Sequence, residues 1–141
     1  MIALPQPNDL TSLVVRTDFH DDHAWQALQA AIDSADEYRN ATYVDDRACT
    51  GITVEDLIQA NAAAADDHKR FHLFLADAVT MTSAEHLLLA VDLHDEPGRS
   101  FRVPHHRYAE ISKNLVIANL DFADFADVVD NSGAYRGFGD D

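Results

Sequence analysis

The sequence has 141 residues, 47% of them apolar, and its 25 acidic residues outnumber its 10 basic ones, which gives a net charge of −15. This length and apolar content fit one globular domain over residues 1–141 with a buried core, and exclude a disordered chain. The negative charge argues against nucleic acid or an anionic membrane surface as a partner. The single cysteine, Cys49, excludes an intramolecular disulfide.

Residues 1–11 are expected to form an irregular lead-in, because Pro5 and Pro7 oppose regular structure. They have neither the basic start nor the apolar run of a secretory signal peptide. No apolar run of membrane-spanning length follows anywhere in the chain. We therefore expect a cytoplasmic protein that is not embedded in a membrane.

Strand-like and helix-like patterns alternate through the first half of the chain. Runs of apolar, β-branched residues predict strands, whereas apolar residues recurring every three or four positions predict helices. Thr53 followed by Asp56 resembles a capping box, so a helix is expected to begin there. In chain order the patterns predict a strand at 13–19, a helix at 22–36, a strand at 41–46, the helix from Thr53 and a strand at 71–77.

The second half begins with two strands and ends with helices. Turn-forming residues at 95–98 separate two apolar runs, which predicts an antiparallel hairpin. The glycine-containing tail at 131–141 is expected to be flexible, although its segment 135–138 is expected to fold back onto the domain. The remaining elements are predicted as a short helical turn at 83–86, strands at 87–92 and 100–103, a helix at 106–119 and a last helix from Asp121.

This order of elements predicts an α/β fold. Two strand–helix–strand units favour a parallel arrangement of the first three strands, with right-handed crossovers. The last two strands form the antiparallel hairpin. We therefore expect a mixed sheet of about five strands with helices packed on it.

Carboxylates follow each of the first three predicted strands, as Asp18, then Asp45 and Asp46, then Asp77. The carboxyl ends of parallel strands share one edge of a sheet, and open α/β sheets bind ligands at that edge. Arg16 is placed to neutralise part of such a cluster. The cluster would bind a hard cation such as Mg²⁺ or receive a basic group of a partner. Helix capping and turn formation explain the same residues without any ligand, and this alternative stays open.

A second group of candidate ligands lies at the start of the helix predicted at 22–36. Asp18, His20 and His23 are residue types that bind metal ions, and they lie close together in the sequence. A solvated helix start with acidic residues in its first turn accounts for this stretch equally well. The sequence contains no glycine-rich phosphate loop and no nucleophile elbow, so no catalytic residue is assigned.

Several stretches of the chain carry a family resemblance. They are LVVRTDF-x-DD-x-AW at 13–25, ATYVDD at 41–46, a long stretch at 74–103 and NLVIANLDFADFADVVD at 114–130. Together they resemble an actinobacterial family of small acidic proteins that is catalogued as a domain of unknown function. The resemblance implies a bacterial cytoplasmic origin and supplies no activity.

Three functions follow as hypotheses. The first is a non-enzymatic acidic binding module for a basic protein partner, of a toxin-neutralising or regulatory type, which needs no cofactor. The second is a divalent-cation-dependent enzyme or small-molecule sensor that uses the aspartates at the carboxyl ends of the strands. The third is a scaffold that forms a homo-oligomer through its carboxyl-terminal helices. The missing catalytic motifs favour the first.

Overall fold

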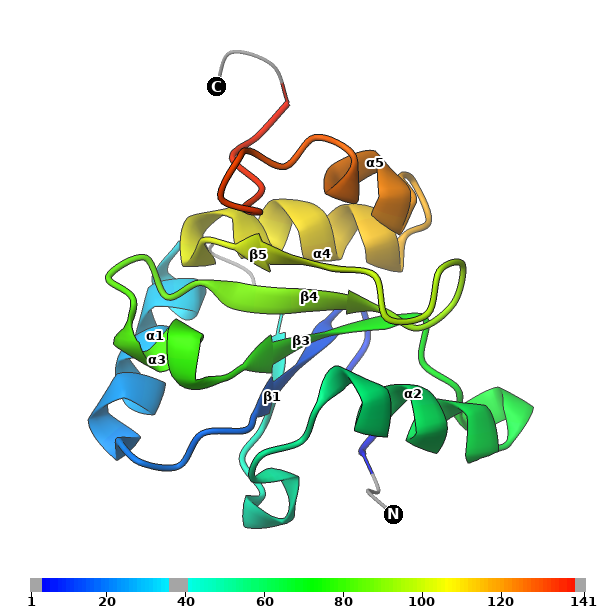
Figure 1. The fold of residues 1–141 in the computed structure, drawn as a ribbon, viewed down its shortest axis with the longest axis horizontal. Helices are drawn as coiled ribbons and strands as arrows, with labels where there is room; N and C mark the ends of the chain where they lie inside the picture. The colour runs from blue at the N-terminus through cyan, green and yellow to red at the C-terminus, as the bar shows by residue number, and fades with distance from the viewer. Residues whose placement is uncertain (1–3, 36–40, 139–141) are drawn as a thin grey trace.

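Five strands form one sheet in a computed structural model that describes residues 4–35 and 41–138 (Figure 1). The strand order across the sheet is β2-β1-β3-β4-β5. In chain order the strands are β1 (Ser12–Arg16), β2 (Ala41–Val44), β3 (His72–Ala76), β4 (Leu88–Asp92) and β5 (Ser100–Val103).

The sheet is mixed. β1 lies between β2 and β3 and is parallel to both, so that Val14 is in register with Tyr43 on one side and Phe74 on the other. β4 is antiparallel to both of its neighbours, β3 and β5. The predicted α/β fold with a five-stranded mixed sheet is confirmed. The strand order differs from the chain order because the chain crosses back over β1 on its way from β2 to β3.

Several of the helices begin where the sequence supplies a capping side chain. The Asp21 carboxylate accepts the backbone N–H groups of His23 and Ala24, and Thr53 with Asp56 forms the predicted capping box. The α-helices are α1 (Asp22–Ser34), α2 (Val54–Ala63), α3 (Ala78–Thr82), α4 (Tyr108–Val116) and α5 (Phe122–Ala126). Short 3₁₀ turns lie at η1 (Arg47–Cys49), η2 (Asp66–His68) and η3 (His105–Arg107).

The helices cover both faces of the sheet and bury a core on each. On one face, α1, α4 and α5 contribute apolar side chains that pack against Val14, Phe74 and Phe101. On the other face, α2 packs through Leu57 against the alternate side chains of β1 and β3. The near-continuous apolar sequence of these strands follows from this burial on two sides. None of the helices among the described residues is long and apolar enough to cross a bilayer.

Two predicted helical segments differ from the structure in position or length. The turn expected at 83–86 is a single hydrogen-bonded turn, from the His86 N–H to the Ser83 carbonyl, and the short helix α3, which was not predicted, lies just before it, where Asp77 and Thr80 form a capping box. The helix predicted at 22–36 ends at Ser34, and residue 36 lies outside the described residues.

The tail folds back onto the domain as far as residue 138. Ala134 forms a parallel bridge with Arg102, and the Tyr135 ring is fully buried against Phe125 and Phe101. Arg136 forms an ion pair with Glu85. The fold-back expected for this segment is therefore present in its described part.

Candidate functional site

Five aspartates surround the carboxyl ends of β1 and β2, and we name Asp18, Asp21, Asp22, Asp45 and Asp46 the acidic rim. The last residue of β1, Arg16, lies beneath them with only 3% of its side chain exposed. Its guanidinium contacts Asp22 at 2.7 Å and Asp45 at 3.3 Å, and its Nε donates to the backbone carbonyl of Asp18 at 2.9 Å. One buried cation therefore fixes the geometry of the rim.

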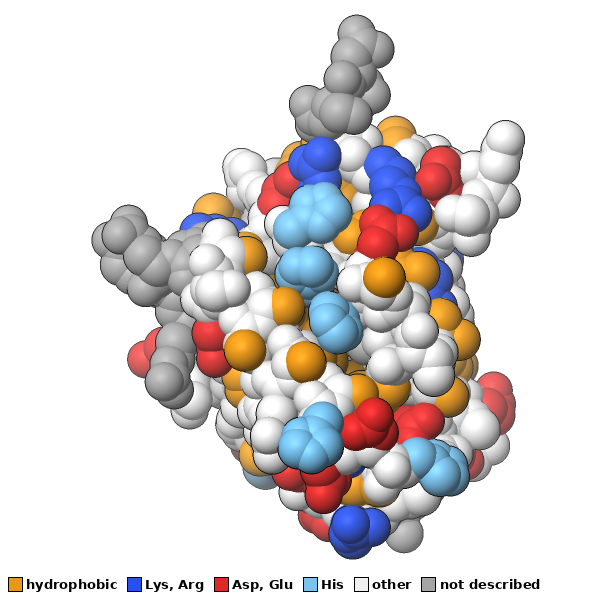
Figure 2. Space-filling model, turned by 90° about the vertical axis from the view of Figure 1, so that its left-hand side faces the viewer, with side chains coloured by type: hydrophobic (Ala, Val, Ile, Leu, Met, Phe, Trp, Pro, Cys, Tyr) orange, Lys and Arg blue, Asp and Glu red, His pale blue; other side chains and the backbone are white. Residues whose placement is uncertain are grey.

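Aromatic rings hold the Arg16 guanidinium from the other side. Its Cζ atom lies 4.4 Å from the centroid of the Phe19 ring and 5.6 Å from that of Trp25, distances typical of cation–π contacts. These three side chains line an open hollow of about 380 Å³, together with Asp22, Gln26, Asp45 and Arg47. Acidic and histidine side chains gather on the face of the molecule that carries α1 and α3 (Figure 2).

The surroundings of two rim carboxyls, Asp18 and Asp22, lower the pKa of each. A hydrogen bond from the backbone N–H of His20 lowers the pKa of Asp18, although burial opposes this change. The hydrogen bond from Arg16, reinforced by the guanidinium charge, lowers the pKa of Asp22. These two carboxyls therefore stay ionised throughout the physiological pH range.

The four predicted edge carboxylates do not share one site. Asp46 accepts the backbone N–H of Ala48 and caps η1. Asp77 follows β3 at the same edge, but Arg102 occupies both of its carboxylate oxygens, at 2.8 and 2.9 Å. The parallel strands do bring their ends to one edge, as the bond from Thr17 N–H to the carbonyl of Ala76 shows. Asp77 thus pairs with Arg102 of β5, whereas Asp45 pairs with Arg16 of β1.

The candidate metal ligands also use their side chains locally. The Nδ1 atom of His20 lies 2.7 Å from a carboxylate oxygen of Asp18, and His23 lies in the first turn of α1. Among the described residues, no three histidine, cysteine, aspartate or glutamate side chains are grouped so that they would hold a metal ion. The structure therefore gives the Asp18, His20 and His23 set no support as a metal centre.

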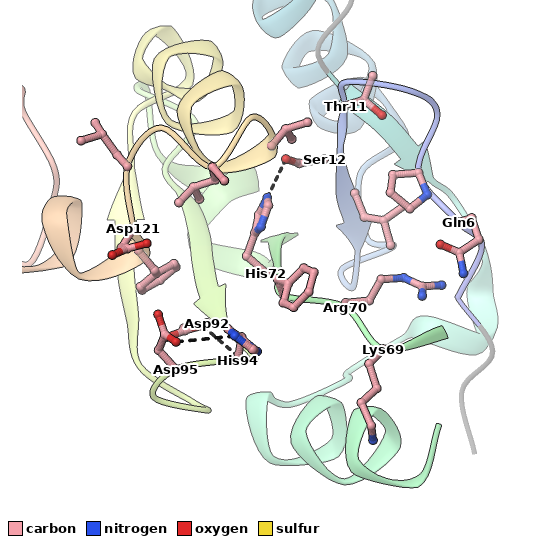
Figure 3. Close-up of a pocket in the computed structure, with 18 residues that line it drawn as sticks. Gln6, Thr11, Ser12, Lys69, Arg70, His72, Asp92, His94, Asp95 and Asp121 are labelled. Atoms are coloured by element: carbon pink, nitrogen blue, oxygen red, sulfur yellow. Dashed lines mark hydrogen bonds and ion pairs between the residues drawn. The ribbon is translucent and has the colours of Figure 1, made fainter. Parts of the chain in front are cut away.

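A cavity of about 530 Å³ lies at the opposite end of the parallel strands from the rim (Figure 3). The inner wall of this cavity contains His72, the first residue of β3. The Nε2 atom of His72 lies 2.8 Å from Ser12 Oγ, which in turn lies 2.7 Å from Ser112 Oγ. Sequence reasoning missed this chain of side chains because its members come from distant segments. The spacing of His68 and His72, four residues apart, is the one local feature of the sequence that singles out His72, and it carries no information about Ser12 or Ser112.

The environment of His72 does not match that of a catalytic base. Burial lowers the pKa of His72 to about 4, partly opposed by the charge of Asp92. The two carboxylate oxygens of Asp92 accept hydrogen bonds from the backbone N–H groups of His94 and Glu96, each at 2.9 Å. Asp92 therefore does not orient the imidazole. Ser12 is only 2% exposed. The group is a neutral, buried polar chain beside a cavity, which suits ligand recognition better than nucleophilic attack.

Comparison with known families gives one match. A family model with the description "Domain of unknown function (DUF6924)" matches residues 11–138. No curated protein matches the chain. The matched region includes every helix and strand, the acidic rim and most of the residues that line the cavity.

Proposed function

The chain belongs to the family described as a domain of unknown function (DUF6924), and since that description states no activity, we propose from the surface of the protein itself that it is a non-enzymatic acidic binding module. Its partner is a basic protein, which it recognises through the acidic rim. The resemblance of the sequence to small acidic actinobacterial proteins supports a bacterial, cytoplasmic setting for this interaction.

The charge balance at the rim carries this proposal. Five carboxylates meet two guanidinium groups, Arg16 and Arg47, and Arg16 is buried beneath them. Asp21 and Asp46 are exposed, and the contacts recorded for their carboxylates are with backbone N–H groups. Each carboxylate retains acceptor capacity that a lysine or arginine of a partner would use.

Preorganisation makes the rim suited to association. Arg16 holds Asp22 and Asp45, and the caps of α1 and η1 hold Asp21 and Asp46, so little side-chain freedom remains to be lost on binding. The net charge of −15 would accelerate encounter with a positively charged partner and repel acidic ones.

A cation-dependent reaction at this edge has less support. It would need several carboxylates that point at one position, whereas Asp77 is paired with Arg102 and Asp46 caps a turn. The same observations are compatible with a protein interface, because an interface can use carboxylates that are spread along an edge.

Binding of a defined basic peptide tests the proposal. We would titrate nonalysine into the protein and into the variant Asp21→Asn with Asp46→Asn by calorimetry. Asparagine caps helices as well as aspartate does, so this variant loses two charges and retains its fold. We expect about fivefold weaker binding by the variant, which corresponds to about 1 kcal/mol for two exposed ion pairs.

The matched control is Asp66→Asn with Asp67→Asn on η2, an equal change of charge on exposed residues away from the rim. The control should bind nonalysine within about twofold of the wild type, and raised salt should weaken binding in all three proteins. Equal losses in both double variants, or binding that is indifferent to salt, would reject the rim as the docking site.

A further inference from the structure

The cavity at the opposite end of the parallel strands from the rim has the size and walls of a small-molecule site. Its volume of about 530 Å³ lies in the range of ligand pockets, and five separate segments of the chain line it. Its apolar lining includes Phe122, Leu115 and Leu120, and Phe71, a lining residue that is 65% exposed, lies at its mouth. A ring so exposed beside a hollow is unusual for a side chain whose only role is packing.

The two basic residues that line the cavity direct their charges elsewhere. Lys69 Nζ donates to the carbonyls of Asn61 and Ala62 at the end of α2, each at 3.0 Å. The Arg70 guanidinium donates to the carbonyls of Leu4 and Pro5 at 2.9 and 2.8 Å. Figure 3 shows both side chains extending away from His72. The terminal donors of both side chains therefore serve backbone carbonyls, although the buried Nε atom of Arg70 has no hydrogen-bond partner among the described residues.

The acidic residues that line the cavity outnumber the basic ones. Asp92 is buried and serves the backbone of the adjacent turn, but Asp95 and Asp121 are exposed. Asp95 lies 3.7 Å from the Nε2 atom of His94, whose ring packs edge-on against Phe71 with centroids 4.6 Å apart. Carboxylates and aromatic rings therefore occur together at the mouth, a combination that favours cations.

The inner wall adds no positive charge. His72, whose pKa burial lowers to about 4, is neutral at physiological pH, and its contact with Ser12, which also lines the cavity, continues to the buried Ser112. The wall is thus a polar but uncharged surface behind an acidic, aromatic mouth.

We propose that this cavity binds a small organic cation, a protonated amine carried on an apolar or aromatic body. The body would occupy the apolar lining beside Phe122 and Leu120, while the ammonium group would lie between the carboxylates of Asp95 and Asp121 and the ring of Phe71. This site is independent of the acidic rim, so a result that contradicts one of the two proposals does not bear on the other.

Three probes of nearly equal shape test the charge preference. Phenethylamine, 2-phenylethanol and 3-phenylpropionate carry the same ring with a positive, neutral or negative end. Backbone amide shifts in nuclear magnetic resonance titrations would report their affinity and position. We expect phenethylamine to bind at least about tenfold more tightly than 3-phenylpropionate, the ratio produced by about 1.4 kcal/mol of charge interaction. Its largest shifts should fall in residues 69–72, 92–95 and 115–122.

Two variants locate the recognition. Asp95→Asn with Asp121→Asn should abolish the preference for the amine and leave 2-phenylethanol binding unchanged. Phe71→Leu replaces an exposed ring, so it preserves the fold and should weaken amine binding several-fold. The rim variant Asp21→Asn with Asp46→Asn is the charge-matched control and should bind phenethylamine as the wild type does.

Specific results of these titrations would contradict the proposed amine site. Preference for 3-phenylpropionate, equal binding of all three probes, or absence of amine binding at millimolar concentration would overturn the proposal. If the double variant unfolds, unchanged amine binding by Phe71→Leu would also overturn it.

Discussion

Arg102 on β5 binds both carboxylate oxygens of Asp77, which lies at the end of β3 on the far side of β4. The two side chains are 22% and 27% exposed, so this ion pair is largely shielded from water. Because Asp77 is also the N-cap of α3, the pair helps to fix the start of this helix.

Loss of Arg102 should destabilise the fold. Burial of Asp77 opposes its ionisation, but the bonds from Arg102 and Thr80 hold the pKa of this carboxyl below its usual range. Arg102→Gln would remove the guanidinium group that donates to both oxygens of this half-buried carboxylate. We expect the free energy of unfolding in urea to fall by about 1.5–3 kcal/mol, the value of hydrogen bonds to a charged group.

Arg99→Gln provides the comparison, since Arg99 pairs with Glu96 and Asp127, whose side chains are more than half exposed. Exposed pairs contribute little, so this variant should lose less than about 1 kcal/mol. Similar losses in both variants would show that shielding of the Asp77 pair has no energetic consequence.

Stability should fall below neutral pH because of His72. Its pKa drops from an ordinary value of 6.5 to about 4 in the folded protein, so the unfolded chain binds a proton that the folded protein rejects. The penalty is absent above pH 6.5, grows as the pH falls through this window, and levels off below about pH 4. Its full size is about 3 kcal/mol, from 1.36 kcal/mol per pKa unit.

The variant His72→Gln isolates this contribution. Its urea unfolding free energy should fall less steeply between pH 6.5 and 4 than that of the wild type, whereas the exposed-residue control His68→Gln should follow the wild type. Parallel pH profiles for the wild type and His72→Gln would contradict the burial of a neutral imidazole.

The end of the chain should contribute to stability. Tyr135 is fully buried and packs against Phe125 and Phe138, with ring centroids 5.2 and 5.4 Å apart. Tyr135→Ala should cost about 3–5 kcal/mol, as removal of a buried aromatic ring does. Val128→Ala, at a side chain that is 43% exposed, should cost less than about 1 kcal/mol. Thermal unfolding of both variants checks this, and a small effect of Tyr135→Ala would mean that the tail is detached in solution.

Local sequence signals were sufficient for most of the fold. The β-branched and apolar runs located all five strands, and the capping residues Thr53 and Asp56 located the start of α2. The helix α3 was missed because it has only five residues, too few for a repeating apolar pattern. Its capping residues, Asp77 and Thr80, were the signal that would have found it.

The sites depended on contacts that local patterns do not encode. Arg16 was expected to neutralise part of the edge cluster, and in the structure its guanidinium contacts Asp45. The pairing of Asp77 with Arg102 joins residues 25 positions apart, and Ser12 meets Ser112 across 100 positions. Such pairs depend on strand order, which the sequence alone did not specify.

A map of the amides that respond to nonalysine tests the function of the acidic rim most directly. Backbone amide shifts measured at low salt should be largest in residues 18–25 and 44–48, where the rim aspartates lie, and should disappear when the salt concentration is raised. Shifts of equal size over the whole surface, or shifts centred on residues 66–68, would contradict recognition of a basic partner by the rim.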